Sequence, residues 1–326
     1  MPSGSTGADA LRETLALARA AEGLGYSRYW LAEHHNGPGL AGTAPEVLAA
    51  RAASVTSTIR VGAGGIPLSH YSPLKVAEAF RVLEALFPGR IDLGLGRTHG
   101  ADEVTTAALR PGPESYGDEY FPRRVADLLS YLGGGLEPGH PHASARAGPE
   151  GPGAPEVWML GSSPYSATLA ASLGLPFCFA QFITPSHGPQ VMARYRRAFT
   201  PASPGDRPRG AVAVSVVCAD SGAEAERLAT SQAVWRLRAE EERGPAPPPG
   251  EAAASLAGMD PLRRARLAQD RGRVVVGGPE HVRDEVRALA EAFAVEEVLV
   301  VTVCHDPAAR RRSYELLARA LGPTGP

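Results

Sequence analysis

The sequence has few cysteines and no long apolar run. Its 326 residues include three cysteines, Cys178, Cys218 and Cys304, each in or just after an apolar segment. A sparse, odd set of cysteines in a chain of this length argues against a disulfide framework and is typical of a reducing compartment. We therefore expect three small buried thiols and a cytoplasmic protein. Since no apolar run approaches the ~20 residues that cross a bilayer, no membrane span is expected.

The chain also has no export signal and no long basic segment. Residues 1–5 contain neither a positive charge on a side chain nor an apolar core, so no signal peptide is expected. The 33 Lys and Arg residues nearly balance the 35 Asp and Glu residues, and the formal net charge is −2. Two short arginine clusters, at 263–266 and 310–312, lie in helical patterns that are typical of solvated faces. Nucleic-acid binding is therefore not expected.

Several catalytic motifs are absent as well. No His-Glu-x-x-His motif or paired-cysteine spacing occurs, so the sequence offers no zinc site. No Gly-x-Ser-x-Gly elbow occurs either, which argues against a serine hydrolase of the α/β type. The segment Gly94 to His99 follows the dinucleotide pattern Gly-x-Gly-x-x-Gly only in part, because its last residue is His, and it is weak support for that function.

Short β-rich apolar runs alternate with helical patterns along the chain. Several runs are apolar at consecutive positions, as strands covered on both faces are. This alternation predicts βαβ units and a parallel sheet. With 44% hydrophobic residues and this length, we expect one domain, residues 1–326, with the fold of a (β/α)8 TIM-type barrel with loop insertions. The seven expected strands are Tyr29–Ala32, Ile59–Ala63, Ile91–Leu95, Val157–Leu160, Phe177–Ala180, Ala213–Cys218 and Val298–Val303.

Helix starts and loops are also marked. The first helix is expected at about Ala8–Glu22, which leaves residues 1–7 too short and too polar to supply a good strand. Either the first barrel strand is short or missing, another segment takes its place, or the barrel is not closed. Capping-box arrangements are expected at Thr43 and Ser221, and helix-starting prolines at positions 73, 279 and 307. Three Pro- and Gly-rich segments without periodicity are expected to be surface loops: Gly133–Pro155, Pro201–Gly210 and Gly244–Gly258.

Polar residues and glycines follow most of the predicted strands. In parallel α/β folds, ligands bind at the carboxyl ends of the strands, so these residues are expected to line one site. The residues at these ends are Glu33, His34, His35, Asn36, Gly64, Gly65, Arg97, His99, Gly161, Ser162, Ser163, Gln181 and His305.

The adjacent His34 and His35 point to opposite faces if the backbone there is extended. Only one of them then faces the barrel mouth, which disfavours a shared metal ion, and no metal site is predicted. The histidine at the mouth is expected to act as an acid, a base or a hydrogen-bond donor near neutral pH. The alternative, a structural histidine that bonds to a loop carbonyl, fits at least one of the two.

Two glycine-containing segments are candidate ligand contacts. Gly64-Gly65 indicates either a close approach of the backbone to something flat or an ordinary glycine turn. The segment Gly161 to Ser166 leads into a helical pattern at Ala167–Leu173. Free amides and hydroxyls at that helix start would make a phosphate cradle, with Arg97 as the fixed positive charge. The alternative is that Ser163 simply caps the helix.

Taken in order, these segments resemble the bacterial luciferase-like flavin-dependent monooxygenases. The resemblance runs from about Leu11 to Ala318. It is most specific in five segments: Tyr29–Asn36, Arg60–Ile66, Glu84–Arg97, Leu160–Ser166, and Val276–Glu280 followed by Glu296–Thr302.

The resemblance implies a barrel that binds reduced FMN supplied by a separate flavin reductase. O2 then forms a flavin C4a-hydroperoxide, which oxygenates a small or medium organic substrate. The resemblance also implies a homodimer. It makes His34 the catalytic histidine, and it places Ala63, Gly64 and Gly65 along the isoalloxazine with a non-proline cis peptide at Gly64-Gly65.

Further site residues are assigned by the same resemblance. Arg97, Ser162, Ser163 and Ser166 match positions around the flavin phosphate, and Glu33 and Gly161 are further cofactor contacts. The substrate pocket is expected to contain His35, Tyr71, His99 and Gln181. Relatives often read Pro-Asn-His-Ser-Pro where this chain has Ser69-His70-Tyr71-Ser72-Pro73, so Tyr71 takes the place of a histidine.

Two other functions fit the same residues. A deazaflavin-dependent hydride-transfer enzyme would differ from the monooxygenase in its preferred cofactor. A non-catalytic flavin-binding protein would retain FMN tightly and show no reductase-dependent oxygenation, and the missing first strand keeps this alternative open.

Overall fold

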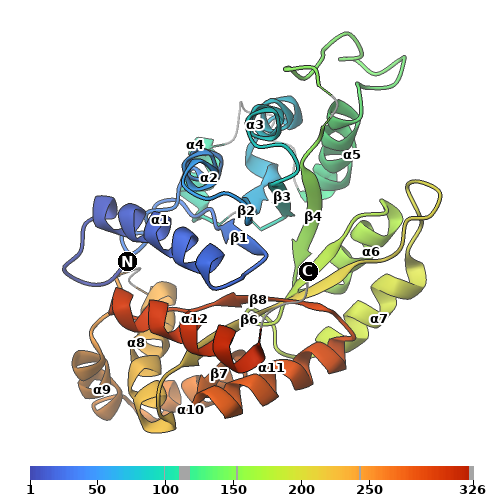
Figure 1. The fold of residues 1–326 in the computed structure, drawn as a ribbon. Helices are drawn as coiled ribbons and strands as arrows, with labels where there is room; N and C mark the ends of the chain where they lie inside the picture. The colour runs from blue at the N-terminus through green and yellow to red at the C-terminus, as the bar shows by residue number, and fades with distance from the viewer. Residues whose placement is uncertain (99, 110–117, 152, 242–243, 323–326) are drawn as a thin grey trace.

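The computed structural model describes residues 1–98, 100–109, 118–151, 153–241 and 244–322. Eight parallel strands in these residues form one sheet (Figure 1). The strands are β1 (Arg28–Leu31), β2 (Arg60–Pro67), β3 (Ile91–Gly96), β4 (Glu156–Gly161), β5 (Phe177–Ala180), β6 (Gly210–Cys218), β7 (Val274–Gly277) and β8 (Glu297–Val301).

The strand order gives a seven-stranded barrel wall with one added strand. The wall runs β1-β2-β3-β4-β5-β6 and continues to β8, which pairs with Ala211–Ser215 of β6. The added strand, β7, pairs with residues Ser215–Cys218 of β6, beyond the residues that pair with β5. All seven predicted strands are therefore confirmed, whereas β7 was not predicted.

The two end strands of the wall, β1 and β8, come close to each other at one point. Arg28 of β1 pairs with Glu297 of β8 at 2.6 Å. In the described chain before the first helix, Pro2 forms an isolated β-bridge with Ala246 and no strand is present. The fold is thus a TIM-type barrel without the strand that an eight-stranded wall would place between β8 and β1, as predicted.

Helices cover the outside of the sheet. The helices α1 and α12 contact each other and lie side by side outside β1 and β8 (Figure 1). None of the described helices is long and apolar enough to cross a membrane. The helices are α1 (Gly7–Gly23), α2 (Pro45–Ser54), η1 (Leu68–His70), α3 (Pro73–Leu86), α4 (Glu103–Leu109), η2 (Asp118–Tyr120), α5 (Phe121–Leu132), α6 (Pro164–Ser172), α7 (Gly188–Ala198), α8 (Gly222–Glu241), α9 (Pro249–Ala257), α10 (Pro261–Asp270), η3 (Arg271–Arg273), α11 (Pro279–Phe293) and α12 (Pro307–Leu321).

Most of the predicted helix starts are confirmed. The prolines at 73, 279 and 307 begin α3, α11 and α12. The Ser221 hydroxyl accepts a hydrogen bond from the Glu224 amide at the start of α8. The prediction for Thr43 was wrong, because Ala44 occupies the N-cap of α2 and no side chain caps that helix.

In their described residues, the segments Gly133–Pro155 and Pro201–Gly210 carry no helix and contribute to a strand only at Gly210, where β6 begins. The segment from Gly244 to Gly258 was wrongly expected to be a loop, because α9 forms within it. Three alanines in a row follow Glu251 in this helix and favour helix more than the flanking prolines oppose it.

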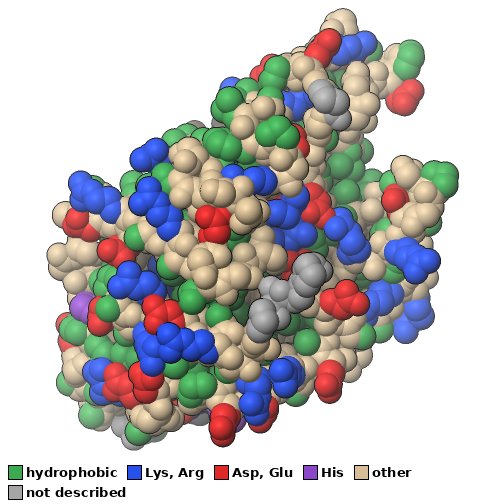
Figure 2. Space-filling view, viewed as in Figure 1, with side chains coloured by type: hydrophobic (Ala, Val, Ile, Leu, Met, Phe, Trp, Pro, Cys, Tyr) green, Lys and Arg blue, Asp and Glu red, His purple; other side chains and the backbone are tan. Residues whose placement is uncertain are grey.

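The barrel interior contains an apolar cluster. Trp30 of β1 packs edge-to-face on Trp158 of β4, with ring centroids 5.5 Å apart. Cys178 and Ala211 pack beside Trp158. The three cysteines are free and buried, as expected. On the surface, basic and acidic side chains are interspersed over the face shown in Figure 2, in keeping with the small net charge.

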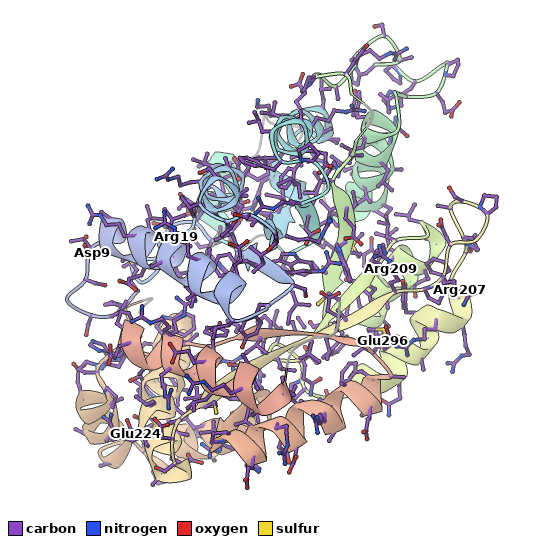
Figure 3. The ribbon with its side chains drawn as sticks, in the orientation of Figure 1. Asp9, Arg19, Arg207, Arg209, Glu224 and Glu296 are labelled. Atoms are coloured by element: carbon purple, nitrogen blue, oxygen red, sulfur yellow. The ribbon has the colours of Figure 1, made fainter. Side chains whose placement is uncertain are left out.

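Charged side chains close the barrel at the amino-terminal ends of the strands. Arg28 pairs with Asp92 of β3 at 2.8 Å and with Glu156 of β4 at 2.9 Å. Arg60 of β2 pairs with the same two carboxylates, and Arg209 also pairs with Glu156. Figure 3 shows Arg209, just before β6, and Glu296, just before β8, on the same side of the molecule. This charged layer fixes the wall at the end opposite the predicted site.

Candidate active site at the carboxyl ends of the strands

The segment after β1 turns its two histidines to opposite sides. Trp30 faces the barrel interior, where it contacts Trp158. The strand β1 ends at Leu31, and an extended continuation of its backbone puts His34 on the same side as Trp30. His34 is exposed, whereas Glu33 is buried and His35 is half-buried. His34 therefore faces the barrel mouth, and His35 lies behind it.

Glu33, His35 and Tyr71 form a hydrogen-bonded cluster behind His34. The Tyr71 hydroxyl donates to Glu33 Oε1 at 2.5 Å, and His35 Nε2 lies 2.7 Å from the same oxygen. The Tyr71 oxygen lies 3.2 Å from His35 Nε2. Burial raises the pKa of Glu33, and the bonds from Tyr71 and His35 partly offset this effect by stabilising the carboxylate. The carboxylate of Glu33 is thus hydrogen-bonded to side chains of the same chain.

The environment of His34 favours its neutral form. Its ring is open to the mouth yet surrounded by protein atoms, and this desolvation lowers its pKa from the usual 6.5. The neighbouring His35 lowers the pKa of His34 further, since two positive rings would repel each other. A neutral imidazole can accept a proton or donate a hydrogen bond near pH 7.

The carboxyl end of β2 is shaped by Gly64 and Gly65. The peptide bond between them is cis, as the resemblance implied. The register against β3 shifts between Gly64 and Ile66, which makes a bulge. A Cβ atom on Gly65 would lie 2.7 Å from the carbonyl oxygen of Gly94, and one on Gly64 would lie 2.9 Å from Trp30 Cβ. Neighbouring strands therefore require glycine at both positions, next to the buried Ala63.

Arg97 and the start of α6 form the positively polarised part of the mouth. The Arg97 guanidinium lies 4.5 Å from the centre of the Tyr165 ring, in the first turn of α6. Ser163 occupies the N-cap with extended backbone angles, but its side chain makes no capping bond. The Ser163 side chain therefore does not cap α6, which was the alternative to a phosphate contact. Its hydroxyl and the first amides of the helix remain available for an anion.

Hydrogen bonds join the loops that follow the first three strands. The His35 amide donates to the carbonyl of Gly100 at 3.2 Å, and the His34 amide donates to the carbonyl of Gly42 at 2.9 Å. The Ser69 hydroxyl donates to the carbonyl of Arg97 at 3.4 Å. With the contact of Arg97 to Tyr165, the ends of β1, β2, β3 and β4 form one connected rim.

The remaining predicted residues are placed as follows. Gly161 and Ser162 end β4 and precede α6, and Ser166 is buried against Gly161. Gln181 follows β5, is buried, and donates to the carbonyl of Pro185 in its own loop at 3.0 Å. His99 lies outside the described residues. Among the described residues, no group of three or more His, Cys, Asp or Glu side chains is arranged to hold a metal ion.

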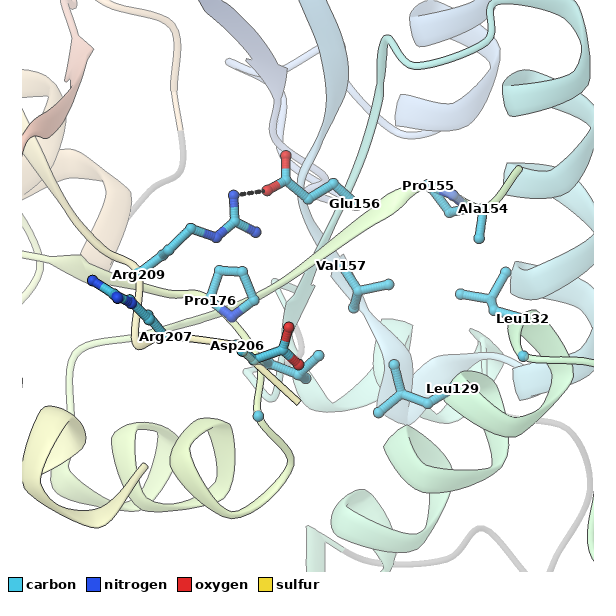
Figure 4. A pocket seen from close by; sticks show the side chains of 14 residues that line it. Leu129, Leu132, Ala154, Pro155, Glu156, Val157, Pro176, Asp206, Arg207 and Arg209 are labelled. Atoms are coloured by element: carbon cyan, nitrogen blue, oxygen red, sulfur yellow. Dashed lines mark ion pairs between the residues drawn. The ribbon is translucent and has the colours of Figure 1, made fainter. Parts of the chain in front are cut away.

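A hollow of about 610 Å³ lies at the opposite end of the barrel. Leu129, Leu132 and Val157 lie on one side of it, and Arg209 reaches Glu156 on the other (Figure 4). Its walls come from the starts of β4, β5 and β6 rather than from their carboxyl ends. Because the chemistry of parallel barrels sits at the carboxyl ends, this hollow is not the candidate active site.

Sequence reasoning missed two supporting arginines and one ring. Arg124 of α5 donates to the carbonyls of Leu68, Ser69 and Tyr71, and so holds the η1 turn. Tyr165 was noted as part of its motif without a role. Arg28 was overlooked, although charged residues at the starts of several apolar runs are a signal that a layer of ion pairs closes the barrel.

Distantly similar solved structures share the fold. One is the oxygenating constituent of 3,6-diketocamphane monooxygenase from Pseudomonas putida in complex with FMN, 21% identical with a TM-score of 0.70, covering 99% of this chain and 95% of that one. Another is an F420-dependent secondary alcohol dehydrogenase, 15% identical with a TM-score of 0.70, covering 98% of this chain and 96% of that one.

Nearer relatives cover almost the whole chain. The crystal structure of apo-MsnO8 is 42% identical with a TM-score of 0.88, covering 98% of this chain and 95% of that one. A luciferase-like monooxygenase of Escherichia coli is 40% identical over 97% of this chain and 92% of its own length. The N-acetyl-S-alkylcysteine monooxygenase of Bacillus subtilis is 34% identical over 98% and 94%. The family profile described as luciferase-like monooxygenase matches residues 1–296, and this chain belongs to that family.

Proposed function

We propose that this chain is the oxygenase component of a two-component flavin monooxygenase. It would take reduced FMN from a separate flavin reductase and use O2 to oxygenate a small or medium organic substrate. The observation that carries the proposal is the placement of Arg97 over Tyr165 at the start of α6, on the rim that also carries the exposed His34. The resemblance further supports a homodimer, and the sparse, odd set of cysteines supports a location in the cytoplasm.

The residues of the rim fit FMN at its phosphate end. A phosphate needs fixed positive charge and hydrogen-bond donors, and Arg97, the Ser162 and Ser163 hydroxyls and the first amides of α6 supply both. The isoalloxazine would lie against the backbone at Gly64-Gly65, where the two glycines and the bulge present a surface without side chains. When bound, reduced FMN supplies the electrons that activate O2.

Side chains around the flavin site would transfer protons and bind the substrate. His34 would accept or donate a proton there, because its neutral form is favoured and its ring is open to the mouth. Gln181 has a buried Oε1 that finds no hydrogen-bond partner in the described part of the chain. A substrate with a donor group would satisfy this oxygen, which makes Gln181 a candidate specificity residue.

The first experiment is equilibrium binding of reduced FMN and of reduced riboflavin under anaerobic conditions. Loss of one charge-assisted contact costs roughly 1.5–3 kcal/mol, so Arg97→Ala should weaken FMN binding about 10- to 100-fold. Riboflavin lacks the phosphate, so its affinity should change little. Arg12→Ala, in an exposed pair on α1, is the matched control and should leave both affinities unchanged.

An oxygen pulse then separates the candidate activities. Reductase-dependent consumption of O2 with an oxygenated product supports the monooxygenase. Binding of FMN without any product would indicate a non-catalytic flavin-binding protein. Failure to bind reduced FMN, together with tight binding of a deazaflavin, would overturn the proposal in favour of hydride transfer.

A further inference from the structure

We infer that Tyr71 is a positioning residue, which holds the segment Glu33-His34-His35 so that His34 faces the barrel mouth. The inference rests on the proposed function, because it assigns Tyr71 a role in the work of His34. The resemblance placed Tyr71, His35 and Glu33 in direct contact with substrate or cofactor. In this inference they instead support the neighbouring side chain of His34.

The first argument is the convergence of two donors on one buried oxygen. Glu33 Oε1 accepts from Tyr71 at 2.5 Å and lies 2.7 Å from His35 Nε2. Glu33 is 5% exposed, so water has little access to it. A buried carboxylate that loses a donor must find another or become protonated. Tyr71 therefore fixes Glu33, and Glu33 in turn fixes the ring of His35.

The second argument is that the backbone of the same segment is held on both sides of His34. The His34 and His35 amides donate to the carbonyls of Gly42 and Gly100. Gly100 also packs closely on the carbonyl of Glu33, where an added Cβ would lie 2.9 Å from the oxygen. With the side chains of Glu33 and His35 both held on the rear side, the ring of His34 is left on the side of the mouth.

The third argument is that Tyr71 comes from a rigid support. Arg124 donates to the carbonyls of Leu68, Ser69 and Tyr71 at 3.0–3.2 Å. His70, which precedes Tyr71, is 1% exposed, and its ring lies 6.4 Å from the ring of His35. The turn that precedes Tyr71 is thus anchored to α5, and it holds the Tyr71 hydroxyl beside Glu33. Such support from behind is what keeps an active-site group in its productive geometry.

The test compares three single variants. Tyr71→Phe removes the donor and keeps the ring. Tyr71→His replaces the hydroxyl with an imidazole, which is also able to donate to Glu33. Tyr195→Phe is the matched control, because its buried hydroxyl donates to the carbonyls of Leu175 and Arg209, away from the rim.

Two readouts are made on each variant. One is turnover with reduced FMN, with kcat separated from the affinity for the flavin. The other is made on the flavin-free protein: the rate at which diethyl pyrocarbonate modifies His34 and His35, located by fragmentation of the labelled peptide. This labelling reports the placement of the two rings without any need for activity.

We expect Tyr71→Phe to lower kcat about tenfold or more, since small displacements of a reacting group are costly, while FMN affinity changes by less than about threefold. His35, released from Glu33, should be labelled several-fold faster, and the rate at His34 should change. Tyr71→His should restore both readouts in large part. Tyr195→Phe should match the wild type in both, even if it lowers thermal stability.

Two results would overturn the inference. One is wild-type labelling in Tyr71→Phe, which would mean that the hydroxyl does not hold the segment. The other is a loss of FMN affinity as large as the loss of kcat, which would mean that Tyr71 contacts the flavin directly. If the wild-type protein itself fails to turn over with reduced FMN, the proposed function fails, and the labelling result still decides whether Tyr71 holds the segment.

Discussion

At the scale of single residues, the protonation of His34 links the structure to a measurable pH dependence. Desolvation by the surrounding protein atoms and the neighbouring His35 lower the pKa of His34 below 6.5, so its neutral form persists below that pH. If neutral His34 is the working form, kcat should stay high at pH 6.5 and fall only as the pH drops through the lowered pKa. The unfolded chain binds the proton first, at the usual pKa of 6.5, so the stability contributed by neutral His34 should fall as the pH drops from 6.5 to the lowered pKa, ahead of the fall in kcat.

The comparison with His34→Ala isolates this group. The variant should lose most of its turnover, on the order of 10²-fold for removal of an acid or base, and should keep flavin affinity within a few-fold. The residual kcat of the variant should not fall as the pH drops through the pKa that His34 has in the wild type. A kcat profile with the same acid limb in both proteins would assign that limb to another group.

The sequence led us to expect that the two histidines face opposite ways if the backbone is extended, but it could not predict their hydrogen-bond partners. Adjacent positions in extended chain face opposite ways, so one histidine at the mouth followed from the pattern alone. The bond from Tyr71 to Glu33 joins positions 38 residues apart, and it depends on how η1 packs against the loop after β1. No local pattern contains that information, and the assignment of Tyr71 to the substrate pocket stays a prediction.

At the scale of elements, the apolar pattern found the strands and misplaced their starts. The strands β1, β4 and β8 begin one residue earlier than predicted, at Arg28, Glu156 and Glu297. A hydrophobicity pattern excludes such residues, although inside this barrel they pair with one another. The strand β7 was missed although it is as long as β1 and β5, and it pairs only with the end of β6.

The close approach of β2 and β3 gives a prediction for one glycine. A Cβ on Gly62 would lie 1.9 Å from the carbonyl oxygen of Asp92, so the two strands must separate to admit it. We expect Gly62→Ala to lower the free energy of unfolding by about 3 kcal/mol. Gly250→Ala in α9 is the control, because its Cβ would meet nothing within 4 Å, and it should be neutral or stabilising by up to about 1 kcal/mol. Denaturant unfolding of both variants measures the difference, and equal stabilities would show that the strands yield easily.

At the scale of the whole molecule, one arginine connects both ends of the open barrel wall. Arg28 lies on β1 and pairs with Asp92 on β3, Glu156 on β4 and Glu297 on β8. Its side chain is 11% exposed, and that of Asp92 is fully buried. In the described chain no strand lies between β8 and β1, so the pair with Glu297 spans the open side of the wall.

Arg28→Met should therefore destabilise the protein far more than the loss of a surface pair would. Removing one partner of a buried ion-pair cluster leaves uncompensated carboxylates and costs roughly 3–5 kcal/mol. Arg12→Met removes a pair in which the arginine side chain is 74% exposed, and it should cost less than about 1 kcal/mol. Denaturant unfolding of Arg28→Met, Glu297→Gln and the double variant yields the coupling between the two end strands. A coupling near zero would mean that the contacts of α1 with α12, rather than this ion pair, hold the open side together.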